Sequence, residues 1–86
     1  MAGHPMHYTY LLESLVRPGV RYVGCTSDLK QRLVDHNSGR CLHTSKNVPW
    51  KLKVYVGFEE LAQAQSFERY LKSGSGHAFA KRHFWV

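Results

Sequence analysis

The chain has 86 residues, enough for one compact domain, and its 43% hydrophobic and 21% charged residues argue against a disordered chain. Twelve Lys and Arg against six Asp and Glu give a formal net charge of +6, which favours a polyanionic partner. Two cysteines outside any CxxC motif exclude a disulfide framework, and the apolar runs are far shorter than the roughly 20 residues of a membrane span. We therefore expect a cytoplasmic protein without a membrane partner.

The N-terminal part predicts a short tail over residues 1–6, followed by a single domain over residues 7–86 that begins with a hairpin. Apolar and polar residues alternate over His7–Glu13 and again over Val20–Cys25, as in strands that bury one face. The intervening Arg17-Pro18-Gly19 is typical of a turn. Two neighbouring antiparallel strands are therefore expected here.

A first helix is expected over Asp28–Asn37, followed by a basic loop. Asp28 can cap the helix, and Gln31 lies three residues later, the spacing of a capping box. Ser38-Gly39 ends the helix. Residues 39–51 are polar and basic, and the length of this stretch indicates a functional loop rather than a tight connection.

The C-terminal half predicts a third strand over residues 52–58 and a second helix over residues 60–72. The strand has one apolar face, formed by Leu52, Val54, Val56 and Phe58. The helix has an apolar stripe that includes Leu61, Ala64, Phe67 and Leu71. Glycine and serine at residues 73–76 break this helix, and a short third helix is expected over residues 78–85. The order β-β-α-β-α-α predicts an α+β fold.

Four side chains of the first half can take part in phosphate chemistry. Arg32 and His36 are four residues apart on the first helix and project together. Arg grips phosphate with a planar fork of donors, and His moves protons near neutral pH. Tyr10 and Tyr22 lie on neighbouring strands, where a phenol or phenolate can help to activate water. The alternatives are a solvated helix face for the first pair and ordinary packing for the tyrosines.

Glu68 flanks the apolar stripe of the second helix, so its carboxylate faces the body of the domain and needs a partner. One hard carboxylate, with water and substrate phosphate completing the shell, is typical of Mg²⁺. An ion pair with Arg or Lys is the alternative. A rival zinc site would use four other side chains, whose spacing matches no common zinc pattern: Cys25, His36, Cys41 and His43.

These residues together resemble a known family. Tyr8-Thr9-Tyr10 corresponds to its first triplet and Tyr22-Val23-Gly24 to its second, followed by Arg32 in an R-x-x-x-H-N run and by Glu68 on a later helix. The chain is similar, over residues 7–84, to GIY-YIG nuclease domains, specifically to the compact single-domain bacterial endonuclease group. The first triplet differs from the family pattern because it lacks the glycine and the isoleucine.

The resemblance implies a small three-stranded antiparallel sheet flanked by helices and a phosphodiester hydrolase that uses one divalent cation, Mg²⁺ or Mn²⁺. By this analogy Glu68 holds the metal, Tyr10 is the general base, and Arg32 stabilises the phosphate, while Tyr22 and His36 orient water or phosphate. The expected substrate is nucleic acid, DNA rather than RNA, in repair or recombination.

The expected nucleic-acid-binding residues are cationic and gather on the first helix, in the basic loop and at the end of the second helix: Arg32, Arg40, His43, Lys46 and Lys72. A basic module that binds nucleic acid without cutting it is the alternative function, with Trp50 and Tyr55 as stacking platforms. For Trp50, which follows Pro49, a core anchor at the start of a strand is the favoured interpretation. Dependence of the activity on a protein partner stays open.

Overall fold

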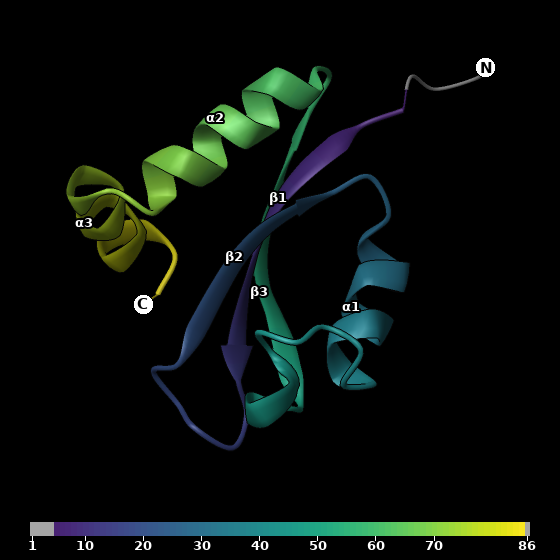
Figure 1. Ribbon diagram of the computed structural model, residues 1–86. Coiled ribbons are helices and arrows are strands. Elements are labelled where there is room, and N and C mark those ends of the chain that lie inside the picture. Colours follow the sequence, from purple (N-terminus) through teal and green to yellow (C-terminus); the bar gives the residue numbers. More distant parts are fainter. Residues whose placement is uncertain (1–4, 86) are drawn as a thin grey trace.

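A three-stranded antiparallel sheet with helices on both faces forms the domain in the computed structural model, which describes residues 5–85 (Figure 1). Residues 1–4 of the predicted tail lie outside this range. The elements in chain order are β1 (His7–Ser14), β2 (Arg21–Thr26), α1 (Leu29–Asn37), the short 3-10 helix η1 (Ser45–Asn47), β3 (Trp50–Phe58), α2 (Leu61–Leu71) and α3 (Gly74–His83). The strand order in space is β2-β1-β3, and the α+β prediction is confirmed.

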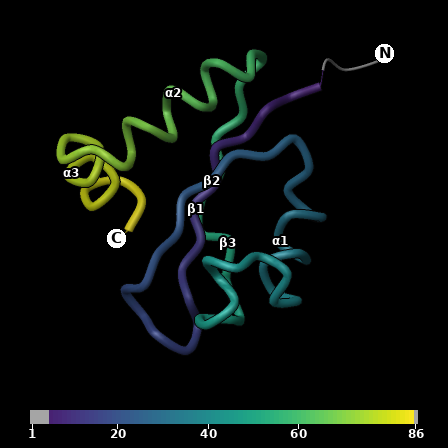
Figure 2. Tube along the Cα trace, in the orientation of Figure 1, coloured from purple at the N-terminus to yellow at the C-terminus, as the bar shows by residue number. Residues whose placement is uncertain are grey.

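The central strand β1 supplies both hydrophobic cores, because its successive side chains point to opposite faces. α1 and the loop after it lie on one side of the sheet, and α2 and α3 lie on the other (Figure 1, Figure 2). Tyr10 and Leu12 pack with Trp50 on the α1 side, whereas Leu11 packs with Leu71 and other residues on the opposite side. None of the helices within residues 5–85 has the length and apolar character of a membrane span.

The β1–β2 hairpin determines how the two candidate tyrosines face each other. Tyr10 pairs with Gly24 and Leu12 pairs with Tyr22, so both tyrosines lie on one face of the sheet, two residues apart in register. The turn contains Gly19 with a φ of 94°, a conformation that favours glycine. The predicted hairpin is therefore confirmed.

The third strand differs from its prediction in two respects. It begins at Trp50, and a β-bulge interrupts its pairing with β1. Leu52 pairs with Leu12 on the α1 side, whereas Val54 pairs with Leu11 on the α2 side. The prediction that Leu52 and Val54 share a face is wrong, because the extra residue of a bulge reverses the alternation of side chains.

The predicted cap of α1 is present, although only half of the capping box forms. The Asp28 carboxylate accepts a hydrogen bond from the Gln31 backbone N–H at 3.1 Å. The Gln31 side chain donates instead to Asp35 at 2.9 Å, one helical turn further on. Gly39 follows the helix with a φ of 80°, in agreement with the predicted stop.

The junction between α2 and α3 is tighter than the sequence suggests. The expectation that residues 73–76 lie between the helices is wrong, because α3 begins at Gly74. Ser73 caps α3 by accepting a hydrogen bond from the Gly76 N–H at 3.2 Å. A Cβ on Gly76 would lie 1.7 Å from the Tyr70 carbonyl oxygen, so this glycine lets the two helices meet. Leu61, expected on the buried stripe of α2, is 48% exposed.

Candidate active site

Two tyrosines and a histidine form a compact cluster on the α1 side of the sheet. The Tyr10 hydroxyl lies 2.8 Å from His36 Nε2, and the Tyr22 ring centroid lies 5.0 Å from the centroid of the same imidazole. The two phenol rings are 6.3 Å apart. Gly24 makes room for this arrangement, since a Cβ there would lie 2.6 Å from the Tyr10 hydroxyl oxygen. Gly24, the glycine of the second triplet, therefore lets the side chain of Tyr10, from the first triplet, lie across β2.

His36 is buried, and both of its ring nitrogens have partners within the protein. Nδ1 lies 2.8 Å from the Thr44 hydroxyl, whose single proton is donated to the Cys41 carbonyl at 3.3 Å. The tautomer that carries the ring proton on Nδ1 satisfies all of these contacts together, since Nδ1 then donates to Thr44 and Nε2 accepts. Consequently Tyr10 donates its hydroxyl proton to Nε2. In the hydrogen-bonded chain Tyr10–His36–Thr44, each group donates to the next one.

The pKa values of Tyr10 and His36 are shifted so that both side chains stay neutral at neutral pH, and nearby charged residues contribute to these shifts. Burial and the nearby Arg32 lower the pKa of His36, although Asp35 opposes them. Burial and the neighbouring Tyr22 raise the pKa of Tyr10 far above its usual value. Arg32 lowers this pKa and Glu68 raises it, so the fields of both charged residues act at the Tyr10 hydroxyl. Arg32 on α1 and Glu68 on α2, helices on opposite sides of the sheet (Figure 1), therefore both influence the Tyr10 hydroxyl.

Glu68 lies in the C-terminal half of α2 and has polar neighbours. The Lys72 ammonium donates to Glu68 Oε2 at 2.8 Å, and the Glu68 side chain is 24% exposed. Burial alone would raise the pKa of Glu68, but hydrogen bonds from Lys72 and Cys25 and the charge of Arg69 outweigh it, and the pKa is lowered. The carboxylate is therefore ionised at neutral pH. The ion pair that was the alternative prediction for Glu68 is present.

The side chains around Glu68 fit a hard cation only when a substrate completes the site. Within residues 5–85, no group of three or more His, Cys, Asp or Glu side chains could hold a metal ion. The four residues of the rival zinc set do not form such a group, and both His36 nitrogens are engaged. A single ionised carboxylate such as Glu68 suits Mg²⁺ or Mn²⁺ when water and phosphate supply the other ligands. Lys72 pairs with this carboxylate in the structure.

The other predicted binding residues lie at the surface, outside the Tyr10–His36–Thr44 chain. Arg40 pairs with Asp35 at 3.3 Å, and His43 and Lys46 are exposed in the loop and in η1. Lys72 is also exposed and reaches the site through Glu68.

Trp50 is not an exposed stacking platform. It is 4% exposed and donates from Nε1 to the Thr44 carbonyl at 2.9 Å, which anchors the basic loop to the core. Tyr55, the other expected platform, is 55% exposed.

Two residues that the sequence did not single out hold the site together. Thr44 bonds His36, and the Asn37 amide bonds both the N–H and the carbonyl of Trp50, which attaches β3 to the end of α1. The sequence does point to Asn37, since it follows His36 in the R-x-x-x-H-N run. Nothing in the sequence distinguishes Thr44 from the other polar residues of the loop. Only the folding of that loop over α1 identifies it.

Comparison with known proteins defines the class. The model of the GIY-YIG catalytic domain matches residues 6–82, so the chain belongs to the GIY-YIG family and the resemblance is confirmed. A UPF0213 protein of Streptococcus pneumoniae is 41% identical over 66 residues, which cover 76% of this chain and 65% of that relative. A UPF0213 protein of Lactococcus lactis is 37% identical over 67 residues, covering 77% of this chain and 66% of the relative. The chain thus spans about two thirds of the length of these relatives.

Two further comparisons extend this result. A structure-specific endonuclease subunit of Candida dubliniensis is 37% identical over 81 residues, which cover 86% of this chain and 27% of that protein. The solution NMR structure of a UPF0213 protein from Bacillus halodurans has a TM-score of 0.53 at 28% identity, covering 88% of this chain and 80% of that one. Its fold agrees with the sheet and helices described above.

Proposed function

We propose that the chain is a divalent-metal-dependent endonuclease that hydrolyses phosphodiester bonds in DNA. The observation that carries this proposal is the buried Tyr10–His36 pair beside Tyr22, at which the charges of Arg32 and Glu68 both act. A protein that only binds nucleic acid has no need of a buried hydrogen-bonded phenol or of a partly buried carboxylate. The name of the Candida relative, a structure-specific endonuclease subunit, supports the same class of reaction.

The difference in burial between the tyrosines suggests different roles for them. Tyr10 is 3% exposed, and its hydroxyl donates to His36, whereas Tyr22 is half-buried and lines an open groove. A general base has to reach the attacking water. We therefore assign activation of the water to Tyr22, in place of the sequence-based expectation of Tyr10. The neutral Tyr10–His36–Thr44 chain positions the Tyr22 ring, and His36 has no free nitrogen for phosphate.

Charged side chains complete the proposed chemistry. Arg32 can hold a non-bridging phosphate oxygen as negative charge develops there. Glu68 would hold the cation, and Lys72, which pairs with its carboxylate in this structure, would contact the substrate backbone. A divalent cation bound there supplies Lewis-acid stabilisation of the phosphate and lowers the pKa of water. Arg40, His43 and Lys46, at the surface, are proposed to bind the DNA backbone.

A cleavage assay tests the function directly. Nicked, branched, single-stranded and duplex DNA would be incubated with the full chain in Mg²⁺, in Mn²⁺ and in chelator. Cleavage is expected only with metal. Glu68→Ala should abolish it while leaving DNA binding nearly unchanged, because one carboxylate is the proposed metal ligand.

Glu59→Ala is the matched control, since it removes an exposed carboxylate just before α2 and should cut like the unmodified protein. Cleavage in chelator, or by Glu68→Ala, would contradict the metal assignment. Binding without cleavage of any substrate would favour the alternative, a non-cleaving nucleic-acid-binding module.

A further inference from the structure

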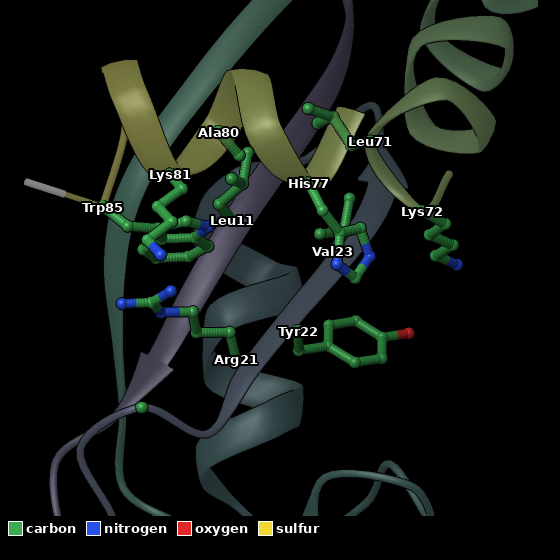
Figure 3. Close-up of a pocket in the computed structure, with 11 residues that line it drawn as sticks. Leu11, Arg21, Tyr22, Val23, Leu71, Lys72, His77, Ala80, Lys81 and Trp85 are labelled. Carbon is green, nitrogen blue, oxygen red and sulfur yellow. The ribbon is translucent and has the colours of Figure 1, made fainter. Parts of the chain in front are cut away.

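A groove of about 520 Å³ lies between β2 and α3, on the side of the sheet opposite the tyrosine–histidine cluster (Figure 3). This volume falls within the range of about 300–1,000 Å³ that is common for small-ligand pockets. Its apolar floor is formed by Leu11, Val23, Leu71 and Ala80. The groove therefore offers an apolar surface large enough for one planar ligand and far too small for a duplex.

The rim of the groove is basic. Cationic and imidazole side chains come from three elements: Arg21 from β2, Lys72 from the end of α2, and His77 and Lys81 from α3. Figure 3 shows His77 and Lys81 extending from α3 toward the groove. Among the described residues, none that lines the groove carries a carboxylate. Glu13 lies outside it and pairs with Arg21 Nε at 3.4 Å. This charge suits an anionic ligand.

An aromatic ring stands at one wall. The Arg21 guanidinium carbon lies 4.2 Å from the centroid of the Trp85 ring, so a planar cation already stacks on the indole (Figure 3). Trp85 is half-buried and packs at the edge of the core cluster around Leu11. A nucleobase that displaces the Arg21 guanidinium from this face would stack on the indole, since every base has an apolar π-face.

Two lining residues connect the groove to the proposed active site across the edge strand β2. Tyr22 lines the groove, as does Lys72, whose ammonium lies 2.8 Å from Glu68 Oε2. A ligand in the groove therefore lies next to Tyr22 and is separated from the Glu68 carboxylate by Lys72. A nucleotide there would be the neighbour of the phosphate that is cut.

We infer that the groove binds one unpaired nucleotide next to the scissile phosphate, with its base against Trp85 and its phosphates at Lys72, His77 and Lys81. This inference rests on the proposed function and extends it. Paired bases cannot enter a space of this size, so the groove would select DNA with an unpaired nucleotide at the cleavage position, such as a flap. Sequence would matter little, because stacking and phosphate contacts read no base edges.

The test measures binding in chelator, where cleavage cannot interfere. The full chain is titrated with a fluorescent duplex carrying a short single-stranded flap and with the same duplex fully paired. The flap duplex should bind more tightly. Trp85→Ala should weaken flap binding by about 5- to 100-fold, the usual effect of losing a stacked base, and leave paired-duplex binding nearly unchanged. Trp85→Phe keeps an aromatic ring and should retain most of the preference.

Two neighbouring cations of α3 give a matched pair. Lys81 lines the groove, whereas Arg82 is exposed and does not line it. Lys81→Ala should therefore weaken flap binding more than Arg82→Ala, although both remove one charge. Equal binding of flap and paired duplex, equal effects of these two variants, or unchanged flap binding by a folded Trp85→Ala variant would overturn the inference.

Thermal unfolding checks that each variant is folded, and the Lys81–Arg82 pair decides the matter if Trp85→Ala does not fold. Cleavage in Mg²⁺ is read separately. Flap preference without cleavage leaves the groove assignment standing and removes the nuclease proposal. Cleavage that is equally fast with and without the flap, and unchanged by Lys81→Ala, removes the groove assignment and leaves the nuclease proposal standing.

Discussion

The two site tyrosines differ in burial, and removal of each hydroxyl should have a different effect. Tyr22→Phe should fold and bind DNA normally but lose about 10²- to 10⁴-fold in cleavage rate, because it removes the proposed route for the proton. Tyr10→Phe leaves His36 Nε2 without its hydrogen bond, so it should lower the free energy of unfolding by about 1–3 kcal/mol.

Single-turnover cleavage and thermal unfolding of the same two variants separate the effects. If Tyr10→Phe is stable but does not cleave, while Tyr22→Phe does cleave, then Tyr10 and not Tyr22 is the general base. If both variants cut at the normal rate, neither hydroxyl takes part in the chemistry.

His36 should make stability depend on pH. Burial and Arg32 lower its pKa below the value of about 6.5 for an unfolded histidine. Between these two pKa values the unfolded chain binds the proton more readily, so the free energy of unfolding falls as the pH is lowered below about 6.5, by at most about 1.4 kcal/mol per pH unit. Above that pH the contribution is complete and constant.

Denaturant unfolding between pH 5 and pH 8, roughly the range over which histidine titrates, measures this effect. His36→Gln should reduce the slope, whereas His43→Gln, which changes an exposed ring, should leave it as it is. If the free energy of unfolding depends on pH equally in the unmodified protein, His36→Gln and His43→Gln, then His36 is not the group responsible.

Spacing along the chain assigned the candidate site residues to their helices and strands but did not predict their contacts. The four-residue interval between Arg32 and His36 correctly implies one helix, yet it suggests a solvated face, and only the packing of α1 on the sheet buries His36. The partner on Nδ1, Thr44, comes from a loop eight residues away, and helical or strand periodicity does not extend into such a loop. The difference in exposure between Tyr10 and Tyr22 likewise follows from tertiary packing.

At the scale of the elements, Gly76 should determine whether α3 can pack against α2. A Cβ at Gly76 would lie 1.7 Å from a backbone carbonyl oxygen, which cannot rotate away as a side chain can. Gly76→Ala should therefore lower the free energy of unfolding by about 1–3 kcal/mol, the usual effect of overpacking. Gly74→Ala, in the first turn of the same helix, has no neighbour within 4 Å and should be neutral or slightly stabilising.

Chemical denaturation of the two variants gives both values, and equal stabilities would contradict the packing argument. Because α3 carries one wall of the groove, Gly76→Ala should also weaken flap-DNA binding more than Gly74→Ala does.

Local signals predicted the order of the elements, while tertiary contacts determined their details. The cap at Asp28 is local and is observed. The alternation along β1 does not appear in its burial, because helices cover both faces of the sheet and residues 9–12 are all buried. The bulge that separates Leu52 from Val54 is not encoded in the alternation of β3, because it depends on pairing with β1. The start of α3 was missed because glycine disfavours helices in isolation, whereas here close packing requires it.

At the scale of the whole molecule, the site surrounds one edge of the sheet. β2 is an edge strand, with the tyrosine–histidine cluster and Arg32 on one face and Glu68 with the groove on the other. A nucleic-acid strand that passes this edge can contact both faces. Candidate residues from Tyr10 to Trp85 thus lie around this one edge strand.

The net charge of +6 should make DNA binding strongly dependent on salt. If the basic residues of the loop, α1 and the groove neutralise about five phosphates, the logarithm of the association constant should fall with the logarithm of salt concentration at a slope of about −4 to −5. Titrations in chelator across a range of NaCl concentrations give this slope. Lys81→Ala should reduce its magnitude by about 1, since one phosphate contact is lost. Trp85→Ala should weaken flap binding without changing the slope, because stacking releases no counterions. A slope near zero for the unmodified protein would remove the electrostatic argument for a nucleic-acid partner.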